Sequence, residues 1–246
     1  MATNLQIKFI KSLHLKKNRV LNQLFIIEGD KNIEELMHQK DFKIHSIYAV
    51  DFSKLPQNTK KLNIEEVSAK QMEQITCLAS PSNILALVHY PIYSNINKVD
   101  WLQLYLDDIK DPGNLGTIIR TAHWYGIEQI FLSPGCVDVF NPKTIQSSMG
   151  SIFYVITKIM SFEEVISESK YSDIYGALFD GVSHRNVNFK SNSLLVIGSE
   201  SHGISKEVQD KIQTKVTIPR FSNTESLNAA IATSILIDQF RADFDN

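Results

Sequence analysis

Apolar positions follow two alternating periodicities along the chain, and this alternation predicts strands separated by helices. In the first part of the chain, Ile7, Ile10 and Leu13 recur at helical spacing, and Asp30 and Ser68 are placed to cap two further helices. Short apolar runs predict strands at 24–28, 45–50, 61–65 and 84–89. This order of elements predicts a small α/β layer.

A stronger alternation follows in the rest of the chain. Apolar strands are expected at 102–106, 129–132, 174–178, 194–197 and 215–218. Helices are expected between and after them at 115–125, 142–149, 162–167, 205–212 and 226–240. Strands that are apolar throughout are typical of a parallel sheet covered by helices on both faces, so the predicted class is α/β. In such sheets, ligands bind at the carboxyl ends of the strands.

A segment rich in proline, serine and asparagine at 90–98 separates the two patterns. This composition is typical of a loop or linker, so we place a domain boundary near residue 95. The predicted organisation is one domain at 1–95 and a second at 96–246.

The first of three polar segments that follow predicted strands is Asp111-Pro112-Gly113-Asn114, a sequence typical of a turn. Asn114 lies where a helix is expected to begin, so it could serve only as the helix cap. Arg120 follows six residues later, which places it about 120° around the helix from Asn114. An isolated helical arginine is most often solvated surface, so this segment alone does not define a site.

The second segment is Gly198-Ser199-Glu200, with a further glycine at position 203. It lacks the Lys-Ser/Thr pair of a P-loop and the spacing of a dinucleotide fingerprint. The glycines would let a ligand approach the backbone, and Glu200 could accept hydrogen bonds from a neighbouring loop. Alternatively, Glu200 is only a favourable charge at the start of the next helix.

In the third segment, Ile218-Pro219 ends the last predicted strand, and Ser226 and Asn228 open a helix of unusually small residues. Ser226 could be simply the helix cap. Small side chains suit a close approach of another backbone or helix, so we expect Asn228 beside them to have a role; they are Ala229, Ala230, Ala232 and Thr233.

Together, the three segments resemble the motifs of the SpoU (TrmH-like) family of RNA ribose 2'-O-methyltransferases. The matching motifs are Asn114-x-Gly116-x-x-x-Arg120, Gly198-Ser199-Glu200-x-x-Gly203 and Ile218-Pro219 followed by Ser226-Leu227-Asn228. The segment 141–150 is similar to a further family motif, and 9–29 with 79–88 looks like the family's L30e-like RNA-binding domain. The resemblance therefore covers essentially the whole chain.

The resemblance implies that the parallel sheet of the second domain carries a deep trefoil knot formed by the carboxyl-terminal segment. It also implies S-adenosylmethionine as the cofactor, bound in the knot. The positions implied to contact it are Gly198, Ile218, Leu227, Ile197, Met149 and Pro219. It further implies a homodimer in which the carboxyl-terminal helices meet and the active site is shared. The small side chains of the last predicted helix are consistent with a chain that passes through a loop.

The same resemblance implies roles for five side chains in methyl transfer. Arg120 matches the arginine to which the family assigns activation of the ribose hydroxyl. Arginine is normally protonated, so we expect Arg120 to hold the phosphate beside the target ribose, with or without transient proton transfer. Asn114 and Ser226 would orient Arg120 and the RNA backbone, Asn228 would shape the cofactor loop, and Glu200 would hold the loops together. No metal is required, and no cluster of metal-ligating residues is evident.

The expected substrate is structured RNA, and the amino-terminal L30e-like domain favours ribosomal RNA over transfer RNA. Two alternatives stay open: the same chemistry on tRNA, and an RNA-binding module that no longer reacts. The presence of Asn114, Arg120, Ser226 and Asn228 argues against the silent module. A Rossmann enzyme is excluded because its fingerprint is missing.

Charge first argues against nucleic acid as a partner, since 25 Lys and Arg against 27 Asp and Glu leave a formal net charge of -2. Divided at residue 97, however, the chain has 12 basic against 9 acidic residues (+3) before the division and 13 against 18 (-5) after it. The first 27 residues hold five basic side chains and no acid, and Lys16, Lys17 and Arg19 are predicted to contact RNA phosphates. A solvated helix face is the alternative reading.

The spacing of the cysteines and the lengths of the apolar segments indicate the cellular compartment. Cys77 and Cys136 form no disulfide framework or zinc motif, which is typical of reduced thiols. The amino terminus lacks the apolar core of a signal peptide, and no stretch approaches the ~20 apolar residues of a membrane span. We therefore expect a cytoplasmic protein without a membrane partner.

Overall fold

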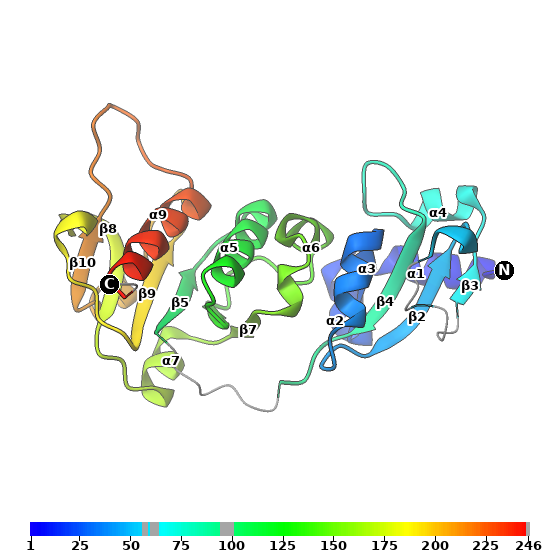
Figure 1. Cartoon of the computed structure of the whole chain (residues 1–246), viewed down its shortest axis with the longest axis horizontal. Helices are drawn as coiled ribbons and strands as arrows, with labels where there is room; N and C mark the ends of the chain where they lie inside the picture. The colour runs from blue at the N-terminus through cyan, green and yellow to red at the C-terminus, as the bar shows by residue number, and fades with distance from the viewer. Residues whose placement is uncertain (56–58, 60–63, 94–100, 245–246) are drawn as a thin grey trace. The chain divides into compact units, whose positions relative to one another are not determined.

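A computed structural model describes residues 1–55, 59, 64–93 and 101–244 of the chain. The chain divides into two compact units (Figure 1). Unit 1 consists of Met1–Ser94 and Phe140–Phe153, and unit 2 of Asn95–Val139 and Tyr154–Asn246. The boundary predicted near residue 95 and the first part of the strand predicted at 61–65 lie outside the described residues.

Unit 1 contains a four-stranded sheet in the spatial order β1-β4-β2-β3. Its strands are β1 (Leu24–Glu28), β2 (Ile44–Ala49), β3 (Ile64–Glu66) and β4 (Ile84–His89). β4 pairs antiparallel with β1 and β2, whereas β2 and β3 are parallel. The helices of this unit are α1 (Asn4–Ser12), α2 (Lys16–Asn22), α3 (Asp30–Met37), α4 (Ala69–Ile75) and α6 (Pro142–Ser148), with 3-10 turns at Phe52–Lys54 and Ser151–Phe153.

Helices cover both faces of the unit 1 sheet. Ile10 of α1 and Met72 of α4 are buried with Ile26 in one cluster. The neighbouring strand residue Phe25 points to the opposite face, where its ring stacks on Phe140 with the centroids 4.3 Å apart. The mixed α/β layer predicted for this part of the chain is confirmed.

One of the two predicted helix caps in unit 1 is confirmed and the other is wrong. Ser68 caps α4, because its hydroxyl accepts a hydrogen bond from the Gln71 backbone N–H and its own backbone N–H donates to the Gln71 side-chain oxygen. Gly29 occupies the cap position of α3 with a φ of 91°, a conformation that favours glycine. Asp30 is instead the first helical residue, where its carboxylate faces the positive end of the helix dipole.

Unit 2 is built on a six-stranded sheet in the order β10-β8-β9-β5-β6-β7. Its strands are β5 (Leu102–Asp107), β6 (Gln129–Leu132), β7 (Ile156–Ile159), β8 (Ile174–Ser183), β9 (Ser193–Gly198) and β10 (Thr214–Thr217). Every strand pair in it is parallel, as the sequence predicts. β5 and β6 are buried along their whole length, because both faces of the sheet are covered.

β7 is a strand that the apolar pattern of the sequence does not predict. This strand lies at the edge of the sheet and pairs only with β6, so its residues are half-buried or exposed. Lys158 interrupts its short apolar pattern. An edge strand of four residues therefore lacks the continuous apolar run by which the central strands are recognised.

The helices of unit 2 are α5 (Pro112–Trp124), α7 (Phe162–Glu168), α8 (Lys206–Gln209) and α9 (Ala229–Ala242), with a 3-10 turn at His184–Asn186. α5 and α9 pack side by side (Figure 1). The Thr121 and Ser234 hydroxyls lie 3.2 Å apart across this contact, and the Tyr125 hydroxyl donates to Asp238 at 2.7 Å. α8 is shorter than the helix predicted at 205–212.

Both cysteines are free thiols, and Cys136 is buried whereas Cys77 is half-buried. Burial, together with the nearby Glu28 carboxylate, raises the pKa of the Cys77 thiol to about 12. Burial also raises the pKa of Cys136. Because the thiolate is the reactive species, we expect neither cysteine of the native chain to react appreciably with a thiol reagent at pH 8. Mass spectrometry after alkylation checks this, with the urea-unfolded chain as the control that reacts at both positions.

The described part of the chain has neither a helix that could span a membrane nor a cluster of metal-ligating side chains. No helix within the described ranges is long and apolar enough to span a bilayer. Over the same ranges, no group of three or more His, Cys, Asp and Glu side chains is arranged to hold a metal ion.

Candidate functional site

The turn before α5 positions Asn114 differently from the simplest sequence reading. Asp111 is the cap of α5, and its carboxylate accepts a hydrogen bond of 2.8 Å from the Asn114 backbone N–H. Pro112 occupies the first helical turn, where its missing N–H costs nothing. Asn114 therefore lies inside the first turn, and its side-chain amide is available for contacts with other segments.

Those contacts join Asn114 to two distant residues in a polar cluster, which we call the Asn-Glu-Asn cluster (Asn114, Glu200 and Asn228). The Asn114 side-chain NH₂ donates to the Glu200 carboxylate. The Asn228 NH₂ donates to the Asn114 carbonyl oxygen at 2.9 Å. The three segments singled out in the sequence therefore meet in one hydrogen-bonded group.

The same cluster fixes the start of α9. The Asn228 side-chain oxygen caps this helix by accepting from the N–H groups of Ala230 and Ile231 at 3.0 and 3.3 Å. Glu200 accepts from the Ala229 N–H at 3.4 Å, so its charge faces the positive end of α9 and not that of α8. The prediction that the last helix begins at Ser226 is wrong, because Asn228 takes the capping role and leaves Ser226 in the preceding loop.

The glycines of the second segment form a tight turn. The backbones of Ser199 and Gly203 exchange two hydrogen bonds, of 3.1 and 2.9 Å, which fold the loop back on the end of β9. A Cβ atom at Gly198 would lie 2.1 Å from the carbonyl carbon of Gly203. Position 198 therefore requires a glycine because the backbone of the same chain leaves no room for a side chain, whether or not a ligand also approaches there.

A cavity of about 550 Å³ is lined by residues 177–179 in the middle of β8, by the carboxyl end of β9, and by the end of β10 with the loop that follows it. Its wall is apolar where it is buried, with Ile197, Val216 and Leu236 each no more than 2% exposed. Seven residues predicted from the sequence line it: Ile197, Gly198, Glu200, Ile218, Pro219, Ser226 and Leu227. This volume and this combination of apolar wall and backbone polar groups suit a small organic molecule.

Other predicted site residues lie outside the cavity lining. Asn114 and Asn228 contact it only through Glu200 and the start of α9. Arg120 is an exposed residue of α5, and in the described part of the chain its guanidinium makes no hydrogen bond or ion pair. Met149 belongs to unit 1 and ends α6 in a left-handed conformation, with φ 51°.

The basic segment at the amino terminus divides into two kinds of residue. Lys16 and Lys17 are exposed, as a phosphate contact requires. Arg19 is only 2% exposed, and its guanidinium donates to the carbonyl oxygens of Leu13 and His14 at 2.8 Å each. The prediction that Arg19 faces RNA is therefore wrong: a buried guanidinium that satisfies carbonyls at the end of α1 is a structural group.

Two groups of cavity residues were not predicted from the sequence, and the first lies in β8. Ala177 and Leu178, at the end of the expected strand at 174–178, and Phe179 directly after it all line the cavity, but no amide side chain marks this segment. Arg220 and Phe221, in the loop after β10, also line it. The rule that ligands bind at the carboxyl ends of parallel strands could have found both groups.

Comparison with known proteins identifies the family in which this arrangement of motifs and cavity occurs. The model of the SpoU rRNA methylase family matches residues 102–238, which carry the cavity and the Asn-Glu-Asn cluster. The chain belongs to the SpoU rRNA methylase family. A second model, the MRM3-like substrate-binding domain, matches residues 4–86.

Relatives of the SpoU chain match it over nearly its full length. It is 30% identical to the 23S rRNA (guanosine(2553)-2'-O)-methyltransferase RlmP of Bacillus subtilis, over 98% of this chain and 97% of that protein. The AdoMet-bound rRNA methyltransferase of Sinorhizobium meliloti has 27% identity and a TM-score of 0.88, covering 98% of this chain and 96% of that one. A TrmH-family protein of Porphyromonas gingivalis has 32% identity and a TM-score of 0.83, covering 98% and 99%. The family and the RNA methyltransferase class expected from the sequence motifs are thereby confirmed.

Proposed function

We propose that this SpoU chain transfers the methyl group of S-adenosylmethionine to a ribose 2'-hydroxyl of ribosomal RNA. The observation that carries the proposal is the cavity between the middle of β8 and the ends of β9 and β10, because seven site residues expected from the sequence line it. Ribosomal RNA is favoured over tRNA because the relatives from B. subtilis and S. meliloti, which match nearly the whole chain, are both named for rRNA.

The cavity fits the cofactor on physical grounds. Ile197, Ile218 and Leu227 supply apolar side chains to its wall, while Gly198 and Gly203, which have no side chain, bring backbone groups to its surface. Backbone donors and acceptors recognise a purine edge without adding charge. The bound cofactor would supply an electrophilic methyl group on a sulfonium ion. The contact of Met149 with the cofactor stays a prediction from the family resemblance.

The chain's own residues must hold the ribose oxygen in line with that methyl group and stabilise its developing charge. Positioning of this kind can lower a barrier by several kcal/mol. Ser226 presents a hydroxyl at the cavity wall, where it can bind the RNA backbone. The Asn-Glu-Asn cluster holds the three loops in register, so that the wall keeps its shape. Arg120, with a free guanidinium, can bind the phosphate beside the target ribose and stabilise negative charge on the oxygen.

We further propose that the site is completed in a homodimer. Arg120 does not line the cavity of its own chain, and the α5–α9 pair exposes apolar side chains that a second copy would cover. Trp124 is 83% exposed and Ile231 is 53% exposed. A second copy packed on this face would bring its own α5, and with it Arg120, to the shared surface.

The homodimer can be tested by substitution of its apolar surface. We expect Trp124→Asp to convert the dimer to a monomer and to lower methyl transfer at least about tenfold, since a buried unpaired charge disfavours association. Ile159→Asp, at an exposed residue of the sheet edge in the same unit, is the matched control and should remain dimeric. Light scattering during gel filtration measures the mass. A wild-type chain that is monomeric and fully active would contradict the homodimer.

Three further assignments complete the proposal. Residues 1–95 form an L30e-like RNA-binding domain in which Lys16 and Lys17 contact phosphates, and residues 96–246 form the methyltransferase domain. The carboxyl-terminal segment passes through a deep trefoil knot, which the small residues Ala229 and Ala230 at the start of α9 would permit. The protein acts in the cytoplasm, where the cofactor and the RNA are both present.

An assay with labelled cofactor tests the proposed function. The purified chain is incubated with tritiated S-adenosylmethionine and with unmodified 23S rRNA, 16S rRNA or tRNA in separate reactions. We expect label in ribosomal RNA, in a product that alkali does not cleave at the labelled nucleotide, because a 2'-O-methyl group blocks that cleavage. Label in tRNA alone would overturn the assignment of ribosomal RNA as the substrate. A chain that binds no cofactor in calorimetry would overturn the proposal that it is a methyltransferase.

A further inference from the structure

Two exposed aromatic rings at the cavity have no role in methyl transfer as described above. Phe179 and Phe221 both line the cavity, yet they are 75% and 85% exposed. The buried wall of the cavity is made by other residues, such as Ile197 and Leu236. The two rings therefore form its solvent-facing rim, on the side from which a large substrate must enter.

A break in the sheet brings Phe179 to this rim. Gly176 pairs with Lys215 of β10, but the next pair joins Val182 to Val216, so that the five residues at 177–181 have no partner on that strand. This excursion carries Phe179 out of the sheet. An ion pair of 2.7 Å between Asp180, in the unpaired segment 177–181, and Lys215 of β10 connects this segment to the neighbouring strand.

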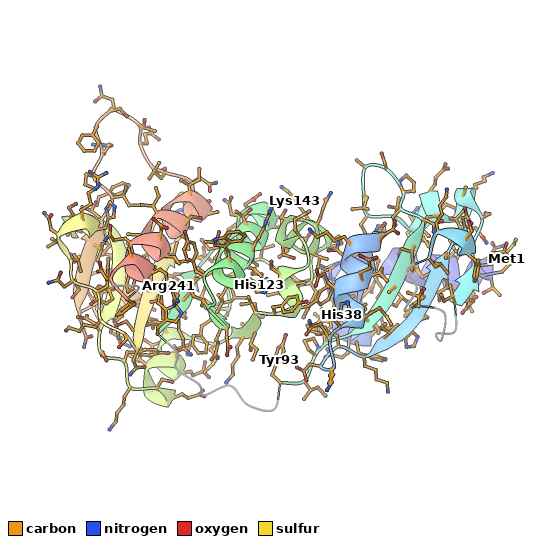
Figure 2. All side chains as sticks on the ribbon, in the orientation of Figure 1. Met1, His38, Tyr93, His123, Lys143 and Arg241 are labelled. Atoms are coloured by element: carbon orange, nitrogen blue, oxygen red, sulfur yellow. The ribbon has the colours of Figure 1, made fainter. Side chains whose placement is uncertain are left out.

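The second ring comes from the loop between β10 and α9, which extends away from the sheet in Figure 1. Figure 2 shows the side chains of this loop pointing outward from it. The Arg220 guanidinium donates to the Thr224 carbonyl oxygen at 3.1 Å, and the Ser222 and Thr224 hydroxyls lie 2.9 Å apart. These bonds fold the loop on itself, so Phe221 is presented by an ordered turn beside a cation.

Resting on the proposed function, we propose that Phe179 and Phe221 bind an unpaired nucleobase of the substrate RNA, with Arg220 on the adjoining phosphate. Proteins that read single-stranded RNA stack its bases on exposed aromatic rings and neutralise its phosphates with arginine. A guanidinium has five N–H donors, so Arg220 can bind a phosphate oxygen while it keeps its bond to Thr224. The site makes the enzyme selective for a ribose in a loop or bulge of structured RNA, where a base can leave the helix.

The adenine of the cofactor is the alternative partner for these rings. It accounts for them less well, because a bound cofactor is expected to lie within the apolar wall, whereas both rings are mostly in solvent. If the rings bind an RNA base, their loss lowers the affinity for RNA; if they bind the adenine, their loss lowers the affinity for S-adenosylmethionine.

Substitution of each ring tests the proposal. For Phe221→Ala and Phe179→Ala, we expect the KM and the Kd for RNA to rise about tenfold, with kcat and the Kd for S-adenosylmethionine changed by no more than about twofold. Phe221→Tyr keeps a stacking face and should behave as wild type. Phe52→Ala removes an exposed ring in unit 1 that does not line the cavity, and should leave both affinities unchanged.

A substrate without the base identifies what the ring binds. In a synthetic RNA hairpin that wild type methylates, an abasic residue is placed at the methylated nucleotide or at either neighbour. At one of these positions, wild type should lose about the tenfold affinity that Phe221→Ala loses, and the variant should lose nothing further. Additive losses at all three positions would overturn the base contact. A Kd for the cofactor that rises with the loss of the ring would assign the rings to adenine instead.

Filter binding with 23S rRNA needs no turnover, so it separates this proposal from the proposed function. A wild-type chain that binds RNA but transfers no methyl group would overturn the function alone. Unchanged RNA affinity in both alanine variants, with active wild type, would overturn the rim site alone.

Discussion

Replacement of Arg120 with alanine is expected to lower kcat by about 100- to 1000-fold while the Kd for S-adenosylmethionine stays unchanged. The size follows from the loss of one preorganised group that stabilises charge in the transition state. Cofactor binding should survive because Arg120 does not line the cavity, and folding should survive because its side chain is exposed and unbonded within the described residues. Radiolabel transfer and calorimetry measure the two quantities on the same preparation.

Two controls sharpen the Arg120 experiment. Arg120→Lys keeps the charge but loses the planar fork that binds a phosphate in two places, so it should recover only part of the rate. Arg185→Ala removes another exposed arginine of unit 2 that lies outside the cavity lining, and it should transfer methyl groups as wild type does. Near wild-type transfer by Arg120→Ala would remove Arg120 from the mechanism.

Gly198→Ala is expected to destabilise the fold by about 2 kcal/mol or more and to weaken cofactor binding at least about tenfold. The added Cβ would overlap the Gly203 carbonyl carbon and the Ile204 nitrogen, which are backbone atoms and cannot rotate away. Relief of the overlap must open the turn at Ser199–Gly203, which forms part of the cavity wall. Urea unfolding and calorimetry report the two effects separately.

The matched substitution for Gly198→Ala is Gly203→Asn. Gly203 has a φ of 67°, and a Cβ there would meet nothing within 4 Å. Asparagine tolerates this left-handed conformation, so the cost to stability should stay near 1 kcal/mol or below. If Gly198→Ala unfolds at the wild-type urea concentration and binds the cofactor normally, the packing account of this turn is incorrect.

Much of the architecture could be predicted from the sequence because the buried strands of a parallel sheet carry continuous apolar runs. β5, β6 and β9 are examples, since their residues are buried along nearly the whole strand. β7 was missed because an edge strand is half-exposed and its apolar residues are interrupted. Pairing order and the five-residue break in β8 depend on contacts between distant segments, which no local pattern records.

The candidate site was predictable to a similar degree. Short motifs identified the loops that meet at the cavity, since residues at the ends of parallel strands share one edge of the sheet. Individual roles needed the structure. Asn114 could have been a cap until Asp111 was seen in that position, and Arg19 could have faced RNA until its guanidinium was seen on the carbonyls of Leu13 and His14. The exposure of Phe221 depends on how the loop folds.

The most direct measurement of the central claim is a map of 2'-O-methylated nucleotides in cellular RNA, made from cells with and without the gene for this chain. The account predicts that one ribose methyl group in ribosomal RNA disappears with the gene and returns when wild type is restored, but does not return with Arg120→Ala. A map of ribosomal and transfer RNA that is identical with and without the gene would contradict it.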